Sequence, residues 1–118
     1  MKPCYSLLVQ GSSAQPEKMG LFTMQDDPHN GRPFYAMNHK NEAFVGRTKG
    51  TGKNSLVTTF LYASKAGWFI GPTISSRTVS LYVVDAVAQP LYIQRTWTAW
   101  SGTGWVKQPR VRMQCICV

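Results

Sequence analysis

The stretch LVTTFLYASKAGWFIG, residues 56–71, indicates the fold class of this chain. It holds two runs, 56–63 and 67–71, that are rich in Val, Ile, Thr and aromatic residues, which favour β-strands. Further runs of the same kind lie on both sides, and Gly, Pro, Asn or Asp separates most of them. They cover residues 5–9, 20–24, 34–37, 78–84, 92–100, 105–106 and 111–118.

Helical periodicity is weak throughout the chain. We expect at most one helical turn, near Asp85–Ala88, ended by Pro90. With 118 residues the chain is long enough to bury one core without metal or disulfide support. We therefore predict an all-β fold in a single small domain, residues 1–118. About eight short antiparallel strands should form a sandwich or a partly open barrel.

The C-terminal run alternates most clearly. Residues 111, 113, 115 and 117 share one apolar face, and the opposite face also turns apolar at Ile116 and Val118. A strand that is apolar on both faces is expected to be central in its sheet or to be covered by another element.

The three cysteines are Cys4, Cys115 and Cys117. Cys115 and Cys117 lie on one strand face and point in parallel, so they are poorly placed to bond each other. Cys4 could pair with either of them if the terminal strands are neighbours. We favour three reduced, mostly buried thiols over a disulfide.

The charge is strongly positive, with 13 Lys and Arg against five Asp and Glu, a net charge of +8. Such an imbalance concerns partners rather than fold. Candidate partners are nucleic acid, an anionic membrane surface or an acidic protein face; a basic surface without a special partner is the other interpretation. No apolar stretch is long enough to span a membrane. The N-terminus is too short and too polar for a convincing signal peptide, so we favour an intracellular location, with an organelle as one option.

The stretch GRTKGTGKNS, residues 46–55, resembles a phosphate-binding loop only superficially. The pattern requires a glycine where Arg47 stands and a hydroxyl where Asn54 stands. We interpret the region as a basic, glycine-rich insertion at about residues 40–55. Loops of this kind carry binding contacts. The candidate partner-binding residues are Lys40, Arg47, Lys49 and Lys53.

No catalytic constellation is apparent. Asp26, Asp27 and His29 lie close together, but their spacing matches no metal-binding loop and turn chemistry explains them. The cysteines and histidines form no pattern that supports a nucleophile. We predict a non-enzymatic protein without metal or cofactor.

The aromatic residues gather in the second half of the chain. We expect Trp68 and Trp97 in the core, because tryptophan in a small β domain usually is buried. Trp100 lies three residues after Trp97, hence on the opposite strand face. Trp100 and Trp105 are therefore candidates for an exposed aromatic contact. Interleaved cations could let such aromatics stack bases or sugar rings; they are Lys65, Arg77, Arg95 and Lys107.

The motifs NGRPFY, GWFIGP and TWTAWSGTGWV, in this order, resemble a tryptophan-rich β module of protist and invertebrate proteins. The resemblance covers about residues 19–113. It implies a non-catalytic module used for binding or assembly, whose tryptophans are signature core residues. It carries over no active-site residue, and it marks residues 40–55 as this chain's own addition.

Three functions compete. The first is a small basic accessory or structural subunit of a larger protein assembly, which docks partly through the insertion. The second is RNA or single-stranded nucleic-acid binding, for which affinity should fall steeply with salt. The third is carbohydrate binding, for which we expect little salt dependence and an exposed Trp100 or Trp105.

Overall fold

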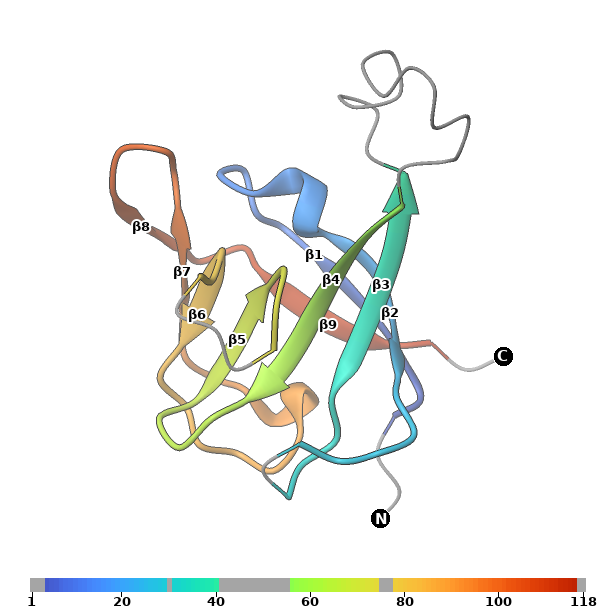
Figure 1. The fold of residues 1–118 in the computed structure, drawn as a ribbon. Coiled ribbons are helices and arrows are strands. Elements are labelled where there is room, and N and C mark those ends of the chain that lie inside the picture. Colours follow the sequence, from blue (N-terminus) through green and yellow to red (C-terminus); the bar gives the residue numbers. More distant parts are fainter. Residues whose placement is uncertain (1–3, 30, 41–55, 75–77, 117–118) are drawn as a thin grey trace, which may run out of the picture.

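The computed structural model describes residues 4–29, 31–40, 56–74 and 78–116, without the side chains of residues 38–40 and 56–57. The described residues form nine strands and two short 3-10 helices (Figure 1). The strands are β1 (Ser6–Gln10), β2 (Gly20–Met24), β3 (Tyr35–Lys40), β4 (Leu56–Ala63), β5 (Trp68–Gly71), β6 (Leu81–Val83), β7 (Trp97–Trp100), β8 (Trp105–Gln108) and β9 (Arg112–Cys115). The helices are η1 (Pro16–Lys18) and η2 (Pro90–Tyr92). The predicted all-β class in a single small domain is confirmed, and every strand lies within or overlaps a run identified in the sequence.

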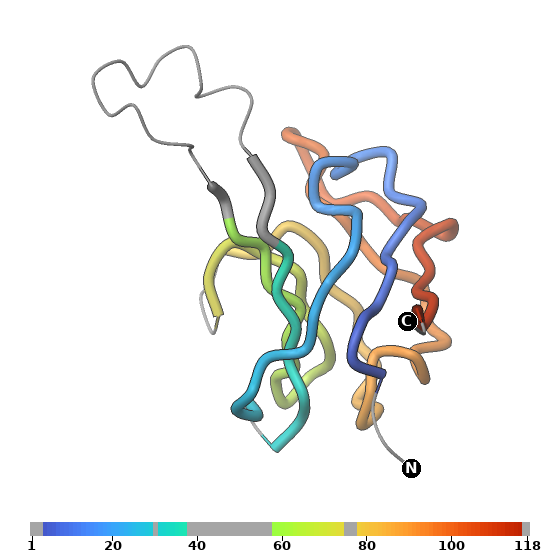
Figure 2. Tube along the Cα trace, turned by 90° about the vertical axis from the view of Figure 1, so that its right-hand side faces the viewer, coloured from blue at the N-terminus to red at the C-terminus, as the bar shows by residue number. Residues whose placement is uncertain are grey.

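All nine strands belong to one antiparallel sheet, in the order β8-β7-β6-β5-β4-β3-β2-β1-β9. From β1 to β8 each strand pairs with the next one along the chain, whereas β9 returns to pair with β1. The sheet curls into a half-barrel, as the natural twist of strands favours. Seen from the side, β1 and β9 run next to each other, across the molecule from β3 and β4 (Figure 2). Of the two expected architectures, the partly open barrel is therefore the one found.

The core lies on the inner face of the curled sheet, to which alternate residues of each strand point. Trp68 and Trp97 belong to it, with exposed fractions of 0% and 2%, so the prediction that both are core residues is confirmed. The indole Nε1 of Trp68 donates a hydrogen bond to the Val87 carbonyl at 2.9 Å. The ring therefore packs against the core without leaving its one polar group unpaired.

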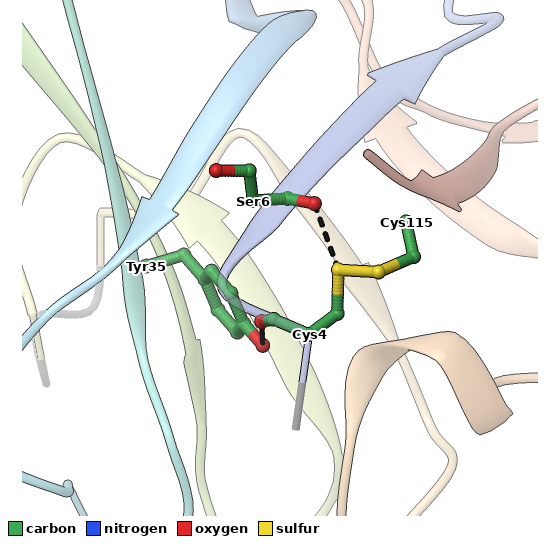
Figure 3. The surroundings of a disulfide bond; sticks show 4 residues. All are labelled: Cys4, Ser6, Tyr35 and Cys115. Carbon is green, nitrogen blue, oxygen red and sulfur yellow. Dashed lines mark hydrogen bonds between the residues drawn. A yellow bond between two sulfur atoms is a disulfide. The ribbon is translucent and has the colours of Figure 1, made fainter. Parts of the chain in front are cut away.

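A disulfide joins Cys4, just before β1, to Cys115 at the end of β9 (Figure 3). The two strands pair so that Leu7 faces Cys115, and the Cα atoms of the two cysteines are 5.8 Å apart, within disulfide range. The favoured prediction of three reduced thiols is wrong. The alternative, that Cys4 pairs across neighbouring terminal strands, is confirmed for Cys115. Only the return of β9 to β1 makes that pairing geometrically accessible.

Tyr35 supports the same corner from β3, which is separated from β1 by β2 in the sheet. Its hydroxyl donates a hydrogen bond to the Cys4 carbonyl at 2.5 Å (Figure 3). Burial disfavours the phenolate and raises the pKa of Tyr35 to about 12. The phenol therefore remains a neutral donor at physiological pH.

One local expectation is corrected, and a second is narrowed to one of its two alternatives. No helical turn forms at residues 85–88; the short helix η2 instead begins at Pro90, because proline suits a first helical position, where no N–H donor is needed. Asp85 accepts a hydrogen bond from the Gln94 backbone N–H at 3.0 Å. The C-terminal strand β9 was expected to be central or covered. It is an edge strand with η2 packed against it, so the second alternative is the one found.

Candidate functional site

The β7–β8 hairpin presents two tryptophans at its tip. Trp100 ends β7 and faces Trp105, the first residue of β8. The tight turn between them is closed by a hydrogen bond from the Ser101 N–H to the Gly104 carbonyl at 2.9 Å. Gly102 supplies the positive φ of +102° that this turn requires. The sequence SGTG thus places the two indole rings on neighbouring strands at one end of the sheet.

Tyr82 of β6 completes this group, which we call the aromatic triad: Tyr82, Trp100 and Trp105. The ring of Trp105 meets Tyr82 edge-to-face with centroids 5.1 Å apart, and meets Trp100 in the same manner at 5.3 Å. Trp100 is 39% exposed and Trp105 is 46% exposed, whereas Trp97 is buried. The prediction that Trp100 lies on the opposite face from Trp97 is confirmed. The triad is a locally ordered aromatic surface that faces solvent.

The triad is the open end of an aromatic row on the outer face of the sheet. In the strand register, Tyr62 of β4 faces Phe69 of β5, which in turn faces Tyr82 of β6. The rings of Tyr62 and Phe69 are 5.7 Å apart, and His29 packs against Tyr62 at the same separation. Tyr62 is therefore covered, and exposure of the row increases toward β8. Cross-strand aromatic pairs of this kind stabilise sheets and fix ring positions.

Cations lie beside the triad. Tyr82, Thr98 and Lys107 occupy one row across β6, β7 and β8, and they border a hollow of about 460 Å³. Arg95, from the segment before β7, lines the same hollow. Among the described residues no carboxylate lines it. The outer face of β6–β8 therefore combines exposed aromatic rings with neighbouring positive charge.

The loop between β1 and β2 holds the hairpin in place. The buried Gln108 side-chain carbonyl, on β8, accepts hydrogen bonds from the Ser12 hydroxyl at 2.9 Å and from the backbone N–H groups of residues 13–14 at 2.9 and 3.2 Å. The Gln15 amide also donates to the Trp100 carbonyl at 2.6 Å. These bonds anchor both strands of the hairpin, so that the triad is presented on a fixed support.

The predicted insertion falls between β3 and β4 in the sequence. Lys40 is the last residue of β3 and faces Leu56, the first residue of β4, so residues 41–55 connect two paired strands. The side chain of Lys40 lies outside the described part of the chain, as do Arg47, Lys49 and Lys53 entirely. Of the predicted site residues, the structure thus brings together Trp100 and Trp105.

The other candidate groups do not assemble into a centre in the part of the chain that the structure describes. There, no group of three or more His, Cys, Asp or Glu side chains is placed to hold a metal ion. Asp26 and Asp27 are exposed. His29 forms an isolated antiparallel β-bridge with Arg32 through the backbone, and its ring packs on Tyr62. None of the described helices is long and apolar enough to cross a membrane.

The sequence did not predict Tyr82 as the ring partner of Trp105, because that contact depends on strand pairing. Arg110 and Arg112 were also not among the predicted contact residues. The sequence does contain a pattern that could have indicated the two arginines. After Asp85 there is no further Asp or Glu, whereas Arg95, Lys107, Arg110 and Arg112 all follow it.

No protein-family model, curated protein or solved structure is significantly similar to this chain. The resemblance to a tryptophan-rich β module therefore stays a prediction.

Proposed function

We propose that this protein is a non-enzymatic β module that docks onto a larger protein assembly as a small basic accessory subunit, with the aromatic triad as a contact surface. The exposure of Trp100 and Trp105 at the tip of one hairpin carries the proposal. Trp, Tyr and Arg dominate the residues whose truncation costs most at protein interfaces. Burial of two indoles that are already fixed in position loses little side-chain entropy, which favours tight docking.

The charge around the triad indicates the kind of protein surface that fits it. Lys107 and Arg95 border the neighbouring hollow, and no described carboxylate lines it. An acidic partner surface is complementary to this rim and would be steered toward it. The contact predicted at Arg47, Lys49 and Lys53 is a second part of the same proposal.

The disulfide bears on where such an assembly resides. Bonds of this kind persist in oxidising compartments and are rare in the cytosol. The Cys4–Cys115 bond therefore supports a secretory, extracellular or oxidising organellar setting over a cytosolic one.

Carbohydrate binding is the second candidate function. This function requires that Trp100 or Trp105 be exposed, and both are exposed. Indole faces stack on sugar rings, and the neighbouring hollow offers the polar side chains of Gln94, Thr96 and Thr98 for hydroxyl groups.

The test is a native pull-down of the tagged protein at moderate salt, in nuclease-treated and untreated halves. The variant Trp100→Ala/Trp105→Ala should lose a fixed set of co-purifying proteins. The loss in affinity for an isolated partner should be about thirtyfold or more, as for a hot-spot residue. The control is Tyr5→Ala, which removes another exposed aromatic ring far along the sequence.

Each outcome decides between the functions. Retention of the same proteins by the double variant overturns the proposal. Loss of the co-purifying material on nuclease treatment would replace it by nucleic-acid binding. If soluble oligosaccharide released the co-purifying material from the unmutated protein, and the double variant bound no such material, carbohydrate binding would replace the proposed docking function.

A further inference from the structure

Four adjoining hollows surround the place where the β7–β8 hairpin meets β9. The hollow beside the triad shares Gln94, Arg95 and Thr96 with a cavity of about 220 Å³. That cavity shares Pro109 and Arg112 with a third hollow of about 510 Å³. A fourth hollow, of about 480 Å³, shares residues 109–110 with the third and Lys107 with the first. The hollows thus adjoin one another through shared lining residues, and together we call them the path.

Four cations line this path, and we call them the cationic seam: Arg95, Lys107, Arg110 and Arg112. All four are exposed. Among the described residues no Asp or Glu lines any of the four hollows. Asp85, the last acidic residue of the sequence, has its carboxylate bonded to the Gln94 backbone N–H. That bond leaves the charge of Asp85 in place next to Gln94, the chain neighbour of Arg95, but the four cations still give the seam a net positive charge.

The strand order, rather than closeness in the sequence, brings the four cations of the seam to one side of the molecule. Residues 109–111 carry the chain from β8, at one edge of the sheet, to β9 at the other. This link brings Arg110 and Arg112 to the same open side as Arg95, which precedes β7. The cations are distributed along the path, and Arg95 and Arg112 line the same hollow. Spaced charges of this kind fit a ligand with repeated anionic groups better than a single small anion.

The chemistry of the seam favours a polysaccharide over a nucleic acid. Proteins that bind single strands stack the bases on exposed aromatic rings. Among the described residues, the aromatic side chains that line the four hollows are Trp97, which is 2% exposed, and Tyr82, which borders the hollow beside the triad. The three hollows that Arg110 or Arg112 lines therefore offer no exposed ring for stacking. The disulfide also points to an oxidising compartment. Guanidinium forks bind sulfate and carboxylate groups well.

We propose that the cationic seam binds a linear acidic polysaccharide that carries sulfate or carboxylate groups. The site adjoins the aromatic triad at Tyr82 but includes neither Trp100 nor Trp105, and it goes beyond the proposed docking function. Its ligand is held by Arg95, Lys107, Arg110 and Arg112 through charge-assisted hydrogen bonds.

The test uses a heparin oligosaccharide of defined length as the probe, with binding measured by calorimetry at several salt concentrations. Arg110→Glu/Arg112→Glu should weaken binding by about tenfold or more, because two attractive surface charges become repulsive. It should also flatten the dependence of affinity on salt. The matched control, Lys18→Glu/Lys65→Glu, makes the same change in net charge at residues that line none of the hollows. Circular dichroism and the intact disulfide verify that each variant is folded.

Further arms separate this site from the alternatives. Equal losses of affinity in the two double variants would show a mere net-charge effect and overturn the proposal. Tighter binding of single-stranded or duplex DNA with the same number of charges would assign the seam to nucleic acid instead. Trp100→Ala/Trp105→Ala should bind heparin as the unmutated protein does; loss of binding there would move the polysaccharide to the triad and refute the seam.

Discussion

Among single residues, Gly11 and Gly102 share a positive φ angle but differ in how closely other atoms pack around them. Their φ angles are +105° and +102°, a conformation that side chains disfavour. A Cβ atom on Gly11 would stand 1.9 Å from the Arg110 carbonyl oxygen, whereas nothing lies within 4 Å of a Cβ on Gly102. Gly11 therefore lets β1 approach the link between β8 and β9.

We expect Gly102→Ala to lower the free energy of unfolding by about 1–2 kcal/mol, from the positive φ alone. Gly11→Ala should cost about 1–3 kcal/mol more, because the backbone must also move apart. Urea unfolding of both variants measures the difference. Equal effects on stability would mean that the approach of residue 11 to the link does not matter.

At the scale of elements, the hairpin that carries the triad depends on a loop from the other end of the sequence. Three donors of the β1–β2 loop converge on the Gln108 side-chain carbonyl. Strand alternation predicts which residues of β7 and β8 face the core, but it does not predict that this loop crosses to them. The rigidity of the candidate site is therefore a property of two elements together.

Gln108→Leu should lower the free energy of unfolding by about 2 kcal/mol or more, because it leaves buried donors without an acceptor. Gln108→Glu keeps an acceptor oxygen and should cost clearly less at neutral pH. Chemical unfolding at pH 7 ranks the two variants. If Leu were tolerated as well as Glu, the hydrogen bonds to the loop would contribute nothing.

At the scale of the whole molecule, the Cys4–Cys115 bond closes nearly the entire chain. The two cysteines are 111 residues apart in sequence, and they join the segment before β1 to the returning strand β9. A cross-link over so long a segment removes much conformational freedom from the unfolded chain.

Cys4→Ala/Cys115→Ala should therefore lower the free energy of unfolding by about 2–5 kcal/mol, mainly through the unfolded state. Reductant should destabilise the unmutated protein to a similar extent and leave the double variant unchanged. Unfolding curves with and without reductant check both expectations. If reductant left the free energy of unfolding of the unmutated protein unchanged, the disulfide would not be stabilising the fold.

Local features of the chain could be predicted from the sequence. Alternating apolar residues and turn signals located the strands and put Trp100 on the opposite face from Trp97, and the usual burial of tryptophan in small β domains placed Trp68 and Trp97 in the core. These features depend on neighbours a few residues apart, and the strand period of two fixes them. The basic charge and the absence of acidic residues after Asp85 are likewise read from the sequence.

Contacts between residues far apart in the sequence could not be predicted in this way. That β9 returns to β1 selects Cys115 as the partner of Cys4, and it brings Arg112 to the side where Arg95 lies. The register of β6 sets Tyr82 against Trp105. The physical reason is that side-chain periodicity fixes the face of a residue within its own strand, whereas strand order and closure follow from burial of one core by all strands at once.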